Sequence, residues 1–153
     1  MNRFTKILLV AFTLAPASPS FAETPIVPLA IDVAGSGVKW GGCPPIFPGA
    51  CAMTVLQGDP AKPNSDVVLR VGPQTTLPRH KHSSAERMIL LSGQLMVKYD
   101  GAPAAILSSG NYAYGPAGLP HVAKCQSKRS CLLFIAFEGP VDADLVVQSE
   151  HKH

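Results

Sequence analysis

Short apolar runs, each ended by a turn that contains Gly, Pro or Ser, fill the chain from about residue 51 to residue 141. The sequence holds 15 prolines and 13 glycines, which favour frequent turns and leave little room for long helices. No window of helical length shows a convincing 3.6-residue apolar period, and we allow only a short helix after Asp142. About eight short strands with turns between them are typical of an all-β sandwich or barrel. The runs are AMTVLQ, DVVLRV, ERMILL, QLMVKY, AAIL, NYAY, HVAKC and CLLFIAF.

The first 22 residues have the pattern of a secretory signal peptide. Arg3 and Lys6 supply its positive charge, and an apolar run follows at residues 7–15. Ser20 and Ala22 stand at the small-residue positions expected before a cleavage site. The run is too short to span a bilayer, although a retained membrane anchor is the alternative. We therefore expect a periplasmic or secreted protein that has no membrane contact once the signal peptide is removed.

The mature chain should form one domain with an extended N-terminal arm. Residues 23–50 form the arm, because TPIVPL and CPPIFPG contain too many prolines for a helix. Residues 51–141 form the β-domain, and residues 142–153 form a C-terminal tail. The formal net charge of +3 falls to +1 once Arg3 and Lys6 are lost, so the sequence gives no case for a nucleic-acid partner.

All four cysteines lie beyond the predicted cleavage point. An even number of cysteines in an exported chain indicates two disulfides. Four cysteines allow three pairings, and the sequence alone does not choose among them. We favour the local pairs Cys43–Cys51 and Cys125–Cys131, because the second pair flanks QSKRS, a polar loop between two predicted strands. Thiolate ligands for a metal are the alternative, but no CxxC spacing supports them.

The segment RHKHSSAERMILLSG concentrates titratable side chains in a chain with only 15% charged residues. In a strand, His80 and His82 point to the same face. After a short turn, Glu86 opens the next strand on a face that it shares with Met88 and Leu90. If that face is the interior, two imidazoles and a carboxylate converge there. A divalent metal would then remove the cost of burying the carboxylate.

A fourth ligand is offered by His121, which follows the turn YGPAGLP and starts another predicted strand. Three imidazoles and one carboxylate suit Mn, Fe, Ni, Cu or Zn and leave one or two positions for water or substrate. Each part also has a simpler explanation, since HxH on an edge strand is usually solvated and a lone histidine can be a hydrogen-bonded core residue. The second HxH, His151 to His153, lies in the predicted tail without a strand context, and we assign it no metal. The joint pattern of spacing, turns and strands favours the first group as one metal site.

These spacings resemble the two sequence motifs of the cupin superfamily. The first family motif is HxH, three or four residues, Glu, six residues and Gly. His80, His82, Glu86 and Gly93 match it in full. The glycine that precedes the motif, Gly72, lies slightly further upstream than in the family.

The second family motif matches with one departure. It runs from Gly110 through Pro116-Ala117-Gly118 to His121, and Cys125 stands where the family has Asn. The likeness covers residues 52–137. The segment PGACAMTVLQGDP is also similar to small exported bacterial cupins of unknown activity.

The resemblance implies a fold and a class of chemistry. The fold is the cupin double-stranded β-helix, an all-β jelly-roll barrel. The implied ligands of one divalent transition metal are His80, His82, Glu86 and His121. The implied function is a metalloenzyme with dioxygenase-, decarboxylase- or isomerase-like chemistry on a small organic molecule, in which Glu86 could act as the catalytic base. A non-catalytic binding protein for a small ligand or a metal is the alternative, and a homodimer is left open.

Three tyrosines are candidates for proton donors or pocket walls: Tyr99, Tyr112 and Tyr114. The last two share one face of their predicted strand, so both or neither face the pocket. Ordinary strand aromatics are the more common explanation. The arginines near the motif are only Arg79 and Arg87, so the sequence favours an apolar or enolic ligand over a phosphorylated one.

Overall fold

The structure, a computed structural model, describes residues 27–147 and contains strands and turns but no helix within that range. The chain divides into two compact units, residues 1–30 and residues 31–153. The described part of the first unit, residues 27–30, has no regular structure, and all the strands belong to the second unit. The strands are β1 (Gly41–Gly42), β2 (Cys51–Gln57), β3 (Ser65–Val71), β4 (Thr76–Lys81), β5 (Glu86–Ser92), β6 (Gln94–Tyr99), β7 (Ala105–Ser108), β8 (Tyr112–Gly115), β9 (His121–Cys125), β10 (Cys131–Phe137) and β11 (Asp144–Leu145).

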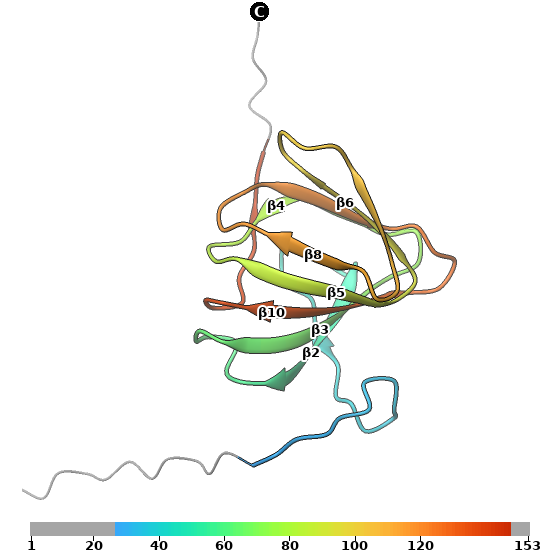
Figure 1. The fold of residues 1–153 in the computed structure, drawn as a ribbon, viewed down its shortest axis with the longest axis vertical. Helices are drawn as coiled ribbons and strands as arrows, with labels where there is room; N and C mark the ends of the chain where they lie inside the picture. Colours follow the sequence, from blue (N-terminus) through green and yellow to red (C-terminus); the bar gives the residue numbers. More distant parts are fainter. Residues whose placement is uncertain (1–26, 148–153) are drawn as a thin grey trace, which may run out of the picture. The chain divides into compact units, whose positions relative to one another are not determined.

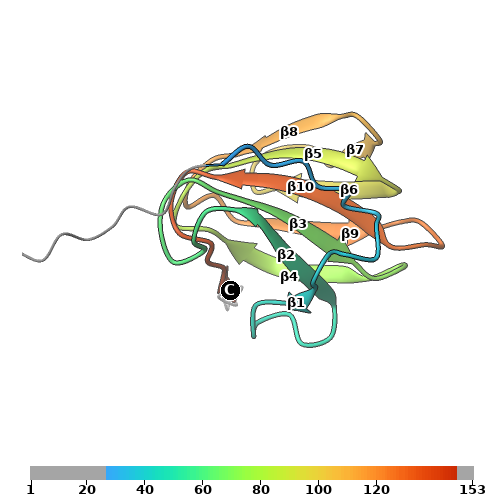
Figure 2. The same ribbon diagram turned by 90° about the horizontal axis from the view of Figure 1, so that it is seen from below.

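The strands of the second unit form two antiparallel sheets (Figure 1, and seen from below in Figure 2). One sheet has the order β1-β2-β3-β10-β5-β8, and the other has the order β11-β4-β9-β6-β7. Neighbours such as β3 and β10, or β4 and β9, come from distant parts of the sequence, as a jelly roll requires. The predicted all-β jelly roll is confirmed. The predicted barrel is not closed, because no ladder joins the two sheets among the described residues, and they form a sandwich.

The core lies between the sheets because buried and more exposed side chains alternate along the central strands. In β10, every second residue from Cys131 to Phe137 is buried, and β9 alternates in the same way. Burying one Leu, Val or Ile side chain contributes roughly 1.5–3 kcal/mol relative to leaving it exposed. The fully buried aliphatic side chains are Leu90, Leu95, Val67, Val68 and Val71.

A β-bulge in β4 turns His80 into the core. Leu77 pairs with Ala123 and His80 pairs with His121, so the register shifts between the two pairs. The shift includes Pro78, which has no N–H to give to a ladder. Leu77 and His80 are therefore both buried, although strict alternation would place them on opposite faces. One strand thus supplies a core side chain and a candidate site side chain.

The two ends of the second unit carry short strands that the sequence did not predict. β1 lies within the predicted arm, and β11 lies within the predicted tail and pairs with β4. The short helix that we allowed after Asp142 is not formed among the described residues, because the chain stays extended and pairs there as β11. The predicted signal peptide, residues 1–22, lies outside the described residues, as do residues 148–153. Within residues 27–147 there is no helix with the length and apolar character needed to cross a membrane.

The four cysteines lie in two pairs at disulfide distance. The Cα atoms are 5.2 Å apart for Cys43 and Cys51, and 5.7 Å apart for Cys125 and Cys131. These are the local pairs that we favour from the sequence. The second pair joins the end of β9 to the start of β10 and so links the two sheets. The first pair closes a loop that contains the buried side chain of Phe47.

Candidate metal centre

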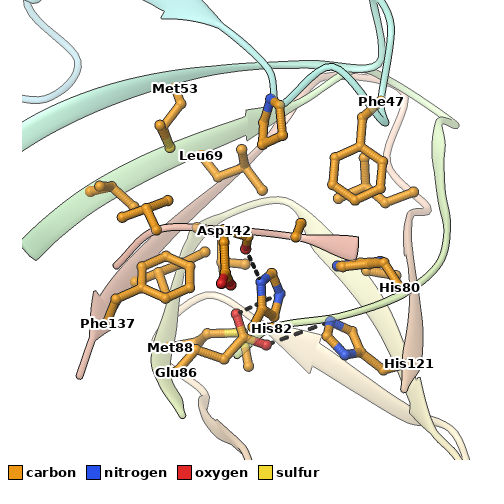
Figure 3. A pocket seen from close by; sticks show the side chains of 18 of the residues that line it. Phe47, Met53, Leu69, His80, His82, Glu86, Met88, His121, Phe137 and Asp142 are labelled. Atoms are coloured by element: carbon orange, nitrogen blue, oxygen red, sulfur yellow. Dashed lines mark hydrogen bonds and ion pairs between the residues drawn. The ribbon is translucent and has the colours of Figure 1, made fainter. Parts of the chain in front are cut away.

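Three histidines and one glutamate meet in a pocket between the two sheets (Figure 3). His80 lies near the end of β4, and His82 follows that strand directly. His121 opens the neighbouring strand β9 and pairs with His80 across the ladder. Glu86 opens β5 in the opposite sheet. The turn between β4 and β5 therefore crosses from one sheet to the other and brings the carboxylate to the imidazoles.

These side chains bring titratable groups into a mostly apolar core. The exposed fraction is 3% for His80, 3% for Glu86 and 5% for His121, and no other titratable side chain among residues 27–147 is buried. His82 is partly exposed. Taking a charged or strongly polar group out of water without a partner costs on the order of several kcal/mol. The convergence of these groups therefore calls for an interaction that compensates for the burial.

Backbone carbonyls fix the orientation of all three imidazoles. Nδ1 of His80 lies 2.7 Å from the carbonyl oxygen of Pro78, and Nδ1 of His121 lies 3.4 Å from that of Leu119. Nδ1 of His82 makes the same kind of bond to the carbonyl of Asp142. A carbonyl oxygen can only accept, so each Nδ1 carries the hydrogen and donates it. Each Nε2 is then left with a free lone pair, as in a metal-ligating histidine.

The free nitrogens point toward a common centre beside Glu86 (Figure 3). One ring nitrogen from each of the three histidines lies within 4.8 Å of those from the other two. The two carboxylate oxygens of Glu86 lie 3.5 Å from Nε2 of His82 and 3.5 Å from Nε2 of His121. The structure thus gathers the three predicted histidines into one cluster and places the predicted glutamate at its edge.

Burial sets the protonation of the site. Burial, with a smaller contribution from the neighbouring histidines, lowers the pKa of His80 to about 4 and the pKa of His121 to about 3. Burial also raises the pKa of Glu86, although nearby His82 acts against this. His80 and His121 are therefore neutral near pH 7, which is the form of imidazole that binds a metal.

The carboxylate of Glu86 is held from behind by two residues. The hydroxyl of Tyr99 donates to Oε1 of Glu86 at 3.5 Å. Gly115 pairs with Glu86 across the β5–β8 ladder, and a Cβ at Gly115 would lie 2.6 Å from Oε1. The absence of a side chain at Gly115 therefore gives the carboxylate its space. The other candidate tyrosines, Tyr112 and Tyr114, are 57% and 51% exposed and do not line the pocket.

The pocket beside the cluster is a small cavity with apolar walls. The space that the centres of water molecules can occupy is about 50 Å³. Besides the three histidines and Glu86, the one polar residue in its lining is Asp142, which the sequence reading missed. Asp142 is 60 residues away from the histidine that it contacts, so no local spacing reveals it. The apolar lining residues are Pro44, Phe47, Met53, Val67, Leu69, Leu77, Met88, Leu95, Val97, Ala123, Leu133, Ile135, Phe137, Val141 and Ala143.

The donor set fits a divalent transition metal. Neutral imidazoles with free Nε2 atoms and a nearby carboxylate are ligands for such ions, and the metal would offset the cost of burying Glu86. The carbonyls bound to Nδ1 are the outer partners that usually orient such histidines. The set does not distinguish Mn, Fe, Ni, Cu and Zn from one another.

Known proteins are similar to this chain in sequence or in structure. A stretch of 76 residues is 37% identical to the quercetin 2,3-dioxygenase of Bacillus subtilis (strain 168), and it covers 49% of this chain but only 22% of that protein. The DMSP lyase DddQ from Ruegeria pomeroyi DSS-3 is similar in structure, with a TM-score of 0.60, 20% identity and coverage of 73% of this chain and 62% of that one. This chain thus spans less than two thirds of either protein. The polyketide cyclase RemF from Streptomyces resistomycificus has a TM-score of 0.62 and 22% identity, with coverage of 80% of this chain and 89% of that one.

The two structural likenesses establish the fold, and a family model establishes the family. Residues 36–142, well over half of the chain, match the model described as the ChrR cupin-like domain. The two sequence motifs and the jelly-roll sandwich agree with that match. The chain belongs to the ChrR cupin-like family of the cupin superfamily.

Proposed function

We propose that the protein is a metal-dependent enzyme that acts on a small organic molecule. One divalent transition metal would be held by His80, His82, His121 and Glu86. The observation that carries the proposal is the common orientation of the three imidazoles, which donate through Nδ1 to the backbone and leave Nε2 free. The names of the similar proteins, a dioxygenase, a lyase and a cyclase, favour turnover over simple capture.

The arrangement suits separate roles for the metal, Glu86 and the cavity walls in the proposed reaction. A bound metal would act as a Lewis acid on a substrate oxygen. Glu86, whose pKa is raised by burial, is placed to take a proton from the substrate, and Tyr99 holds its Oε1. The apolar walls keep bulk water away from the reacting atoms. These parts suit dioxygenase-, decarboxylase- or isomerase-like chemistry on a ligand small enough for the cavity.

Export is part of the same proposal. It is supported by the signal-peptide pattern of residues 1–22 and by two cysteine pairs at disulfide distance, which suit an oxidising compartment. The metal would then be acquired in the periplasm or outside the cell, where copper and zinc outcompete manganese and iron at equal supply. A homodimer remains a prediction from the sequence.

The substitution Glu86→Gln tests the catalytic role. Glutamine keeps the size and one coordinating oxygen but is a very poor proton acceptor. A substrate screen on metal-loaded protein, with oxygen uptake monitored, comes first, and activity per bound metal is then compared between the wild type and the variant. We expect the variant to lose turnover even when it is fully metallated. Glu138→Gln, which changes an exposed glutamate outside the pocket, is the matched control.

Two outcomes would count against this function. Equal activity per bound metal in the wild type and in Glu86→Gln would exclude Glu86 as the base. A protein that binds the metal and small ligands but turns over nothing in the screen would favour the non-catalytic binding protein instead.

A further inference from the structure

We propose that the cavity selects a compact, electrically neutral ligand and that the carboxylate of Asp142 accepts a hydrogen bond from it. The inference rests on the proposed metal site and specifies the class of molecule that the site would take. It makes Asp142 a specificity-determining residue, distinct from the four candidate metal ligands.

The first observation is the charge of the cavity lining. No lysine or arginine is among the residues that line it, while two carboxylates are, those of Glu86 and Asp142. The nearby cations are engaged elsewhere, since Arg79 pairs with Asp100 and Arg87 pairs with Glu138. A divalent ion would therefore already be balanced by the two lining carboxylates. An anionic ligand would add a buried charge with no cation to offset it, which is costly.

The second observation is the position of Asp142. Its backbone carbonyl accepts from Nδ1 of His82, and its Oδ1 accepts from the backbone N–H of Ser83 at 2.9 Å. No residue within 27–147 makes a hydrogen bond to its Oδ2, and the side chain is half-buried. Figure 3 shows Asp142 in the same pocket as Glu86 and beside His82. An acceptor is thus left open next to the metal cluster, where it suits an O–H or N–H group close to the ligand atom that faces the metal.

The third observation is the remainder of the wall. Phe47 packs edge-on against His80 with ring centroids 4.7 Å apart, and Met53 and Leu69 line the same pocket. These side chains offer no hydrogen bonds to a phosphate, a sugar acid or a polyol, whose polar groups would be buried without partners. With a space of about 50 Å³, the cavity accommodates an apolar body of a few carbon atoms. The expected ligand has an oxygen for the metal, a donor for Asp142 and a small apolar body.

Three small probes separate the parts of this inference. Isobutyramide is neutral and carries a carbonyl oxygen and an N–H donor. Isobutyrate has the same shape but is an anion without a donor, and methyl isobutyrate is neutral without a donor. Their dissociation constants for the zinc-loaded full chain would be measured by titration of protein NMR shifts. We expect isobutyramide to bind at least tenfold more tightly than methyl isobutyrate.

The variant Asp142→Asn assigns the effect to one residue. The asparagine oxygen can still accept from Ser83, so the local backbone should be retained, but the negative charge is gone. We expect the affinity for isobutyrate relative to isobutyramide to rise at least tenfold in Asp142→Asn. It should not change in Asp144→Asn, which neutralises an exposed aspartate two residues away that does not line the cavity.

Zinc per chain is measured in every sample so that the two proposals can fail separately. Three results in a wild type that holds zinc would overturn this inference alone. The protein could fail to bind isobutyramide, or it could bind methyl isobutyrate as tightly as isobutyramide. It could also show the same affinity for isobutyrate relative to isobutyramide as Asp142→Asn. A wild type that holds no zinc would overturn the metal site and this inference with it.

Discussion

The substitution Gly115→Ala should damage the metal site without replacing a candidate metal ligand. An added Cβ would lie 2.6 Å from Oε1 and 2.7 Å from Cγ of Glu86, and 2.7 Å from the hydroxyl oxygen of Tyr99. Gly115 does not have a positive φ, so the substitution acts through these contacts and not through backbone strain. Because Glu86 is held on both sides, either the carboxylate or the tyrosine must move.

The size of the effect follows from the two ways in which the clash can be relieved. If the core shifts, overpacking typically costs about 1–3 kcal/mol of unfolding free energy. Such a loss lowers the melting temperature by roughly 3–10 °C for a domain of this size. If Glu86 rotates away, the metal loses a ligand, and supporting residues of metal sites typically change affinity by about 10–100-fold. We expect at least a tenfold weaker metal affinity together with a measurable loss of stability.

The assay is metal affinity by competition with a chelator, alongside thermal unfolding of the metal-free protein. Gly42→Ala is the matched control, because a Cβ at Gly42 meets no atom within 4 Å and its φ is not positive. The reasoning would be refuted if Gly115→Ala kept the metal affinity and the melting temperature of the control.

Three further predictions follow from the cysteines, the buried histidines and the N-terminus. Thiol titration of the unfolded, unreduced exported protein should find no free cysteine, and two or more free thiols would contradict the pairing. His80 and His121 are neutral when folded, with a pKa of about 4 and about 3, but regain the usual value of 6.5 on unfolding. The free energy of unfolding of the metal-free protein should therefore fall as the pH falls from about 6.5 toward 4, by up to about 1.4 kcal/mol per pH unit for each histidine. Urea titrations at several pH values should show a smaller fall for His121→Gln than for the wild type. An equal dependence on pH in the two proteins would count against buried neutral histidines. Mass spectrometry of the exported protein should find a chain that begins after Ala22, and an intact N-terminus would contradict cleavage.

Local sequence patterns predicted most of the fold. All eight apolar runs named from the sequence are strands, and β4 appears where the HxH segment requires one. The order of the strands within each sheet was not predictable from local patterns, because it depends on which distant strands pair. The extended chain after Asp142 was also missed, since β11 exists only through its pairing with β4.

The candidate site also contains some residues that local sequence patterns predicted and others that they did not. The cluster of His80, His82 and His121 could be anticipated, because turn spacing and strand alternation are local properties. Phe47 and Asp142 could not, because they reach the pocket from the Cys43–Cys51 loop and from the segment after β10, which carry no pattern of their own.

Metal stoichiometry tests the central claim most directly. Protein purified from its native compartment would be dialysed and analysed for bound elements, beside His80→Ala and His121→Ala prepared in the same way. We expect about one equivalent of a transition metal in the wild type, almost none in either variant, and a lower melting temperature in both. A variant that still holds one tightly bound equivalent would show that the metal is bound elsewhere.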